Sequence, residues 1–267
     1  MLTSARQPAV SGMFYPADAS ELRSVIKRLL DAAATTAACP KAIIVPHAGY
    51  IYSGPIAASA YARVANARSR LSRVVLLGPS HRVPLFGLAA SSAKHFVTPL
   101  GAIEIDEAAL ARLRTLPQVK VLDEAHRLEH SLEVHLPFLQ MTIDHFTLVP
   151  LVVGDAEARD VAEVLDVVWG GQETLIVVSS DLSHYKDYAM AQRLDRATSA
   201  AIERGDAEAL DYESACGRNP VKGLLYAAKA RGLYAHTIDL RNSGDTAGPR
   251  DQVVGYGAYV FDERPAH

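Results

Sequence analysis

The chain has little of what marks several large classes of protein. Its 267 residues include only two cysteines, Cys39 and Cys216, too few for a disulfide framework at this length, which fits a reducing compartment. No apolar run approaches the length that spans a membrane, and the first residues lack the charged-then-apolar order of a signal peptide. We therefore expect a cytoplasmic protein that does not enter a membrane.

The chain also lacks a large excess of charge of one sign. The 27 basic and 30 acidic residues give a formal net charge of -3 and are well mixed along the chain. A protein that binds nucleic acid needs a basic stripe to neutralise phosphates, so we do not expect a nucleic-acid partner. The loop at Gly78 lacks the spacing of a glycine-rich phosphate loop, so we expect neither a nucleotide nor another organic cofactor.

A hydrolase is the weaker alternative from the residues alone. Ser80 precedes His81, and Ser179 lies two residues before Asp181, which places hydroxyl groups near ionisable side chains. Adjacent serine and histidine side chains point apart, however, and no glycine-flanked nucleophile elbow stands at a strand-to-helix turn. These strings therefore do not predict a hydrolytic site.

Three short apolar runs do stand out, because each is rich in Val, Ile or Leu and leads into a histidine. These histidines are His47, His81 and His184. Runs of this kind, stopped by Pro, Gly or Ser, are typical of strands that are buried on both faces in a parallel sheet. Ligands bind beyond the carboxyl ends of such strands, so the pattern predicts one site shared by the three imidazoles.

The rest of the chain alternates between helical and strand patterns and predicts an α/β protein. We expect a single domain over residues 1–267, with a central, mostly parallel sheet and helices on both faces. Strands are expected at residues 41–45, 74–78, 146–153, 175–179, 236–240 and 253–261, with a small hairpin at 96–105. Helices are expected at residues 22–34, 56–67, 106–116, 156–168, 189–204, 207–214 and 220–229. Ser53 or Gly54 is the expected cap of the second of these helices, with Pro55 in its first turn.

The two cysteines have different surroundings. Cys39 lies in an alanine-rich tract and is assigned to packing. Cys216 is expected at the end of the helix 207–214, where Gly217 suits a left-handed cap. A free cysteine is commonly a small buried apolar residue, but a thiolate would also serve as a soft metal ligand. The residues alone leave both roles of Cys216 open.

The segment 123–138 is the densest in polar chemistry. Glu129, His130, Glu133 and His135 lie close in sequence, and spacings of three and four residues let a carboxylate and an imidazole meet on a helix. The zinc-protease motif needs histidines four apart with a glutamate directly after the first, and this segment does not supply it. A surface position or a role in supporting metal ligands is the better prediction.

Six strings of the chain, in this order, resemble the Memo family. They are Pro8-Ala9-Val10-Ser11-Gly12-Met13-Phe14-Tyr15-Pro16, Pro46-His47-Ala48-Gly49-Tyr50-Ile51-Tyr52-Ser53-Gly54, Leu77-Gly78-Pro79-Ser80-His81, Glu129-His130-Ser131-Leu132-Glu133-Val134-His135-Leu136-Pro137-Phe138, Ser179-Ser180-Asp181-Leu182-Ser183-His184-Tyr185 and Cys216-Gly217-Arg218-Asn219-Pro220. The resemblance spans nearly the whole chain.

The resemblance implies a fold similar to the class III extradiol ring-cleaving dioxygenases. It makes His47 and His81 the two imidazole ligands of one metal ion, Cys216 the third ligand, and His184 an acid or base beside the metal. The metal would be iron(II) or copper, with zinc as a further candidate. Because a thiolate replaces the carboxylate of those dioxygenases, the preferred metal and its redox behaviour change, and ring cleavage does not carry over.

These expectations lead to two hypotheses. In the first, the protein is a metal-dependent oxidoreductase that takes oxygen or a small phenolic or carboxylate ligand. In the second, it is a binding module that recognises a peptide or partner protein, with Tyr50, Tyr52 and Tyr185 lining a groove. The resemblance also implies a radical-SAM protein as a partner. The side chains expected to line or support the site are Tyr50, Glu133, His135 and Asp181.

Overall fold

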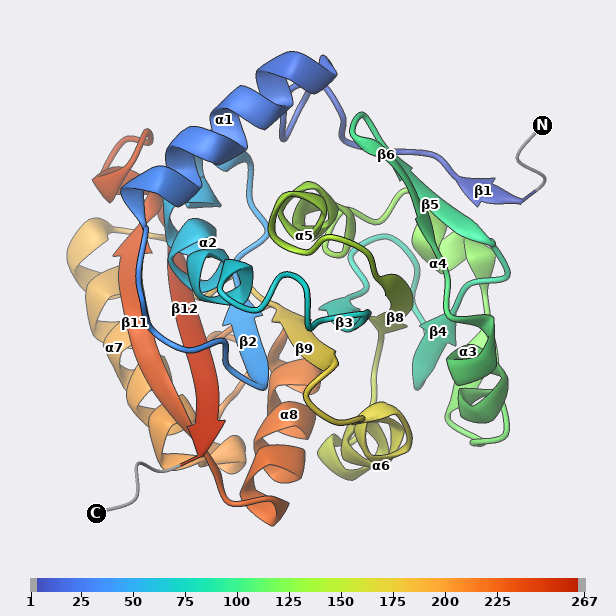
Figure 1. The fold of residues 1–267 in the computed structure, drawn as a ribbon. Helices are drawn as coiled ribbons and strands as arrows, with labels where there is room; N and C mark the ends of the chain where they lie inside the picture. Colours follow the sequence, from blue (N-terminus) through green and yellow to red (C-terminus); the bar gives the residue numbers. More distant parts are fainter. Residues whose placement is uncertain (1–3, 264–267) are drawn as a thin grey trace.

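The computed structural model describes residues 4–263, which fold around a nine-stranded sheet (Figure 1). Its strands are β2 (Ala42–Val45), β3 (Arg73–Pro79), β4 (Leu88–Ala90), β7 (Val119–Val121), β8 (Thr147–Val153), β9 (Thr174–Ser179), β10 (His184–Lys186), β11 (Leu233–Asn242) and β12 (Val253–Glu263). The order is β10-β12-β2-β9-β3-β8-β4-β7, and β11 also pairs with β12. A second, three-stranded sheet contains β1 (Ala5–Arg6), β5 (His95–Thr98) and β6 (Gly101–Glu104).

The α/β class predicted from the sequence is confirmed, and the centre of the main sheet is parallel. Strands β2, β9, β3 and β8 run parallel, and nearly all their residues are buried, which explains why their sequences are continuous apolar runs. The flanks differ: β12 joins β2 antiparallel, and β4 joins β8 antiparallel. The sheet as a whole is therefore mixed.

Helices cover both faces of this sheet, as expected. They are α1 (Ala19–Ala32), α2 (Tyr50–Ala65), α3 (Glu107–Leu113), α4 (Asp123–Arg127), α5 (Leu136–Thr142), α6 (Ala158–Val168), α7 (Tyr188–Arg204) and α8 (Arg218–Ala230). Helices α1, α2 and α5 pack together on one side, and α6 packs against α8 on the other (Figure 1). None of the helices within residues 4–263 is long and apolar enough to cross a membrane.

The register of the central strands brings their carboxyl ends to one edge. Val45 pairs with Ser179, and Leu77 pairs with Val178, so β2, β9 and β3 end at nearly the same level. The chain after β2 leads to His47, and the chain after β3 leads to His81. The edge expected to carry the site is thus formed by neighbouring strands.

Two helix predictions near the site were wrong. Helix α2 begins at Tyr50, before the expected cap, because the backbone N–H of Tyr50 donates to the Phe14 carbonyl at 2.8 Å and Pro55 is tolerated inside the helix. Within residues 207–214 the expected helix is replaced by the 3-10 turn Ala207–Ala209 and a further turn at residues 212–214. Cys216 therefore does not end a helix, and Gly217, with φ of -91°, caps the start of α8 instead of adopting a left-handed conformation.

Candidate metal site

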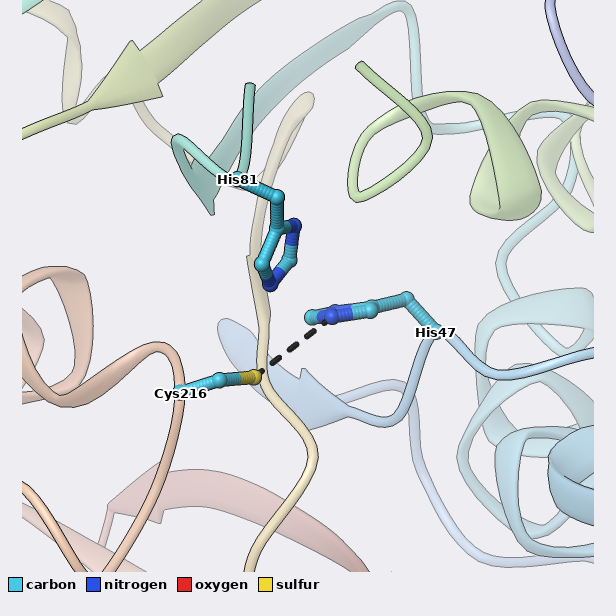
Figure 2. A group of neighbouring side chains, drawn as sticks. All are labelled: His47, His81 and Cys216. Carbon is cyan, nitrogen blue, oxygen red and sulfur yellow. Dashed lines mark hydrogen bonds between the residues drawn. The ribbon is translucent and has the colours of Figure 1, made fainter. Parts of the chain in front are cut away.

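Three potential metal donors meet at the carboxyl edge of the sheet: His47, His81 and Cys216 (Figure 2). Their ligand atoms all lie within 4.8 Å of one another. His47 Nε2 is 3.5 Å from Cys216 Sγ, and the centroids of the two imidazole rings are 5.2 Å apart. The donors come from the β2–α2 loop, from the end of β3 and from the start of α8, so tertiary folding alone brings them together.

The protonation of His47 is set by Ser179. The Ser179 hydroxyl donates to the Ser131 carbonyl at 2.6 Å, so it can only accept from its two other partners. These are His47 Nδ1 at 2.6 Å and His135 Nε2 at 2.9 Å. His47 therefore carries its proton on Nδ1, and the lone pair of Nε2 is left for the site. Burial and the neighbouring imidazoles hold the pKa of His47 well below its usual value, which keeps the ring neutral.

Glu129 has the same effect on His81. Its carboxylate accepts the His81 backbone N–H at 2.6 Å and approaches His81 Nδ1 to 2.9 Å. Burial would raise the pKa of Glu129, but hydrogen bonds from His81 and from the Ser131 backbone outweigh it and lower this pKa to about 2. An ionised carboxylate only accepts hydrogen bonds, so Nδ1 of His81 holds the proton and Nε2 holds a lone pair.

The Cys216 thiol is the third donor. Burial, followed by the nearby Asp181 carboxyl, raises its pKa, so the thiolate needs a cation beside it. The Asp181 backbone N–H lies 3.3 Å from Sγ, and the start of α8 adds the positive end of a helix dipole. Two imidazole lone pairs and a thiol of this kind fit a transition-metal ion, because metal binding deprotonates the thiol.

Comparison with known protein families places the whole fold in one family. The model of the Memo-like protein family matches residues 6–260 of the chain. The chain belongs to the Memo family.

Relatives of this Memo protein match it over nearly its whole length. A MEMO1 family protein of Aquifex aeolicus is 38% identical, with 96% of this chain and 98% of that protein covered. The MEMO1 family protein SSO0066 of Saccharolobus solfataricus is 34% identical, with 96% and 99% covered. Among solved structures, uncharacterized protein JW3007 from Escherichia coli K12 matches with a TM-score of 0.49 and 14% identity, over 81% of this chain and 98% of that one.

His184 and Asp181 of this Memo protein lie beside the three donors but outside their group. His184, on β10, approaches the Leu182 carbonyl with Nδ1 at 2.8 Å, and its charge would act on both His47 and Asp181. Asp181 accepts the His47 backbone N–H at 2.8 Å. Burial raises the pKa of Asp181 to about 6. Asp181 thus fixes the loop that carries His47.

The other expected site residues, His135, Tyr50 and Glu133, lie outside the group of metal donors and bond to neighbouring parts of the chain. His135 is fully buried and reaches His47 only through the shared Ser179 hydroxyl. The ring of Tyr50 packs 4.9 Å from that of Phe138, and its hydroxyl donates to a backbone carbonyl at 2.8 Å. Glu133 forms a buried ion pair with Arg6, so its carboxylate serves the N-terminal segment and not the metal donors.

Ser179, Glu129 and His130 lie near the donors but were not among the side chains expected to line or support the site. For Glu129 and His130 the sequence predicted only a surface position or a role in supporting metal ligands. His130 stacks on His81 with a centroid distance of 4.8 Å and an interplanar angle of 18°, and burial lowers the pKa of His130 to about 4. His81, Glu129 and His130 also form a second group of donor atoms within 4.8 Å. The density of polar residues in segment 123–138 was the available signal, but spacing could not show which of them faces His81.

Proposed function

We propose that this Memo protein binds one transition-metal ion through His47 Nε2, His81 Nε2 and Cys216 Sγ. The observation that carries the proposal is that the three ligand atoms lie within 4.8 Å while Nδ1 of each imidazole already has an oxygen partner. Both Nε2 lone pairs are thereby available at one point. Oriented imidazoles with hydrogen-bonded outer nitrogens are the usual arrangement of histidine ligands in metalloproteins.

The donor types favour iron(II), copper or zinc. A thiolate with two imidazoles suits these softer ions, whereas magnesium and calcium prefer oxygen donors. In the proposed function the metal is iron or copper and the protein is an oxidoreductase that acts on oxygen or a small phenolic or carboxylate ligand. The bound metal would supply Lewis-acid and redox chemistry at this edge of the sheet.

His184 is the proposed acid or base. Its Nδ1 lies 2.8 Å from the Leu182 carbonyl, which only accepts, so Nδ1 carries a proton and Nε2 can take one from a ligand. Asp181 assists indirectly, because it holds the backbone of His47.

Metal analysis of anaerobically purified protein tests the site. We expect about one metal ion per native chain and its loss in a His47→Ala/His81→Ala variant. The exposed His145 offers a matched control, because it lies two residues before the start of β8, at the end of the parallel strands opposite the donors. His145→Ala should leave the metal content unchanged. Equal, substoichiometric metal in the native and double-variant proteins would show that the assigned site is wrong.

Oxygen uptake tests the oxidoreductase. A screen of catechol-like compounds should give metal-dependent uptake, and His184→Gln should lower that uptake while the metal content stays native. The competing proposal is a binding module, which draws support from Tyr185, because this residue is 71% exposed beside His184 and its φ is 56°. The buried Tyr50 gives it none. Metal-dependent uptake with any compound excludes a purely binding protein.

A further inference from the structure

The N-terminal strap, residues 4–16, is held by one buried carboxylate. Glu133 is fully buried and accepts the backbone N–H groups of Ala9 at 2.7 Å and Val10 at 2.9 Å. It also accepts the Tyr15 hydroxyl at 2.6 Å and pairs with the Arg6 guanidinium. Four donors around one buried carboxylate make a strong, specific anchor.

Arg6 extends this anchor to the chain that surrounds His81. Arg6 as a whole residue is only 8% exposed. Its guanidinium donates from Nε to the His126 carbonyl at 3.0 Å and from Nη2 to the Glu129 carbonyl at 2.5 Å. The side chain of Glu129 accepts from the His81 backbone N–H and approaches its Nδ1. Arg6 therefore fixes the main chain of the residue that orients a metal donor.

The strap also contacts the loop that carries His47. The Phe14 carbonyl accepts the backbone N–H of Tyr50, three residues after His47, at 2.8 Å. The Phe14 ring lies 4.9 Å from the ring of His130. One N-terminal segment thus contacts the loop that carries His47 directly and reaches the loop that carries His81 through Glu129. Arg6 and Glu129 are more than a hundred residues apart in the sequence.

We propose that the strap positions both imidazole donors of the metal site, and that Arg6 is the positioning residue on the His81 side. The inference rests on the proposed metal site. It adds that Arg6, which contacts neither a metal donor nor its side-chain hydrogen-bond acceptor group, affects the affinity of the site for metal. Loss of a residue that orients a metal-bound histidine typically lowers metal affinity 10- to 100-fold. Arg6 acts one step further away, through Glu129, so we expect a decrease of about 10-fold.

Titration of the metal-free, full-length protein with Co2+ tests the proposal, because cobalt absorption bands report both affinity and ligand arrangement. Arg6→Lys keeps a cation for Glu133 but lacks the guanidinium fork that reaches two carbonyls. We expect about 10-fold weaker Co2+ binding and shifted bands. Arg73→Ala is the matched control: Arg73 pairs with Asp106 at 2.7 Å near the start of β3, at the opposite end of the strand from His81.

The outcomes separate positioning from stability. Urea denaturation of each metal-free variant gives its loss of stability, and Arg73→Ala should lose stability while its Co2+ affinity and bands stay native. Native Co2+ affinity in Arg6→Lys overturns the proposal. The proposal is also overturned if Arg73→Ala loses as much stability as Arg6→Lys and its Co2+ affinity falls by the same factor. Failure of the underlying metal site gives a different result, namely that His47→Ala/His81→Ala keeps the native cobalt spectrum. If Arg6→Lys does not fold, Tyr15→Phe is the second variant, because it removes a single donor to Glu133. It should also weaken Co2+ binding and shift the bands, by less than is expected for Arg6→Lys.

Discussion

Removal of one hydroxyl group, in Ser179→Ala, should disturb both the stability of the protein and the proposed metal site. Ser179 is fully buried at the end of β9. Its hydroxyl donates to the Ser131 carbonyl and accepts from His47 and His135, at distances of 2.6, 2.6 and 2.9 Å. Alanine has nearly the same size and fills the space, so the effect comes from lost hydrogen bonds and not from a cavity.

The magnitude follows from the three partners of this hydroxyl, each of which loses one hydrogen bond. Each buried polar group left without a partner costs about 1–3 kcal/mol, and partial rearrangement reduces the sum. We expect the free energy of unfolding to fall by about 3–5 kcal/mol. The proton on Nδ1 of His47 is then no longer fixed, and metal affinity should fall by about 10-fold or more.

Urea denaturation of the metal-free protein measures the first effect, and nitrogen NMR of the imidazoles measures the second, since protonated and unprotonated ring nitrogens have different chemical shifts. Ser59→Ala is the control, because the Ser59 hydroxyl donates to Asp239 at 2.8 Å in a half-buried position away from the donors. It should cost about 1 kcal/mol. If Ser179→Ala stays within about 0.5 kcal/mol of native and the His47 shifts do not change, the three-partner assignment is refuted.

Three further changes probe other parts of the structure. Glu129→Gln removes the charge opposite His81 and should weaken Co2+ binding 10- to 100-fold in a titration, so native affinity would contradict the role of this carboxylate. Gly217→Ala would place a Cβ 2.4 Å from the Ser179 carbonyl, and thermal denaturation should show a loss of about 1–3 kcal/mol, whereas a native Tm would contradict the close contact. Burial lowers the pKa of His126 from 6.5 to about 4, so between these values the unfolded chain binds a proton that the folded chain does not, and stability falls as the pH falls. His126→Gln should therefore flatten the dependence of the urea midpoint on pH over this interval, and an unchanged slope would count against the buried neutral ring.

The centre of the fold could be predicted because its physical signal is local. Strands covered by helices on both faces need apolar side chains at every position, and the runs that end before His47 and His81 supplied them. Parallel strands end at a common edge, so the meeting of these two imidazoles followed from the pattern. The antiparallel flanks did not follow, because a three-residue strand such as β4 has too little sequence to reveal its direction.

The errors arose where a distant partner decides the local structure. The start of α2 depends on a hydrogen bond from Tyr50 to Phe14, and no local pattern around Ser53 and Pro55 reports that partner. Gly217 was expected to be a left-handed cap, but it is glycine because a Cβ would meet Ser179 and Ser180. In both cases the contact that decides the local structure is made by a residue far away in the sequence: Phe14 for the start of α2, and Ser179 and Ser180 for Gly217.

The two glutamates of segment 123–138 show why a donor set is easier to predict than the state of its donors. Glu129 and Glu133 are four residues apart, which suggests one face of a helix, but residues 128–132 are not helical. The two carboxylates therefore serve different partners: Glu129 holds His81, and Glu133 holds Arg6 and the strap. Residue types indicated which atoms could bind a metal. Which nitrogen of each imidazole is free to do so depends on Ser179 and Glu129, whose positions are set by folding, so the chemistry of the site is decided as much by these hydrogen-bond acceptors as by the donors themselves.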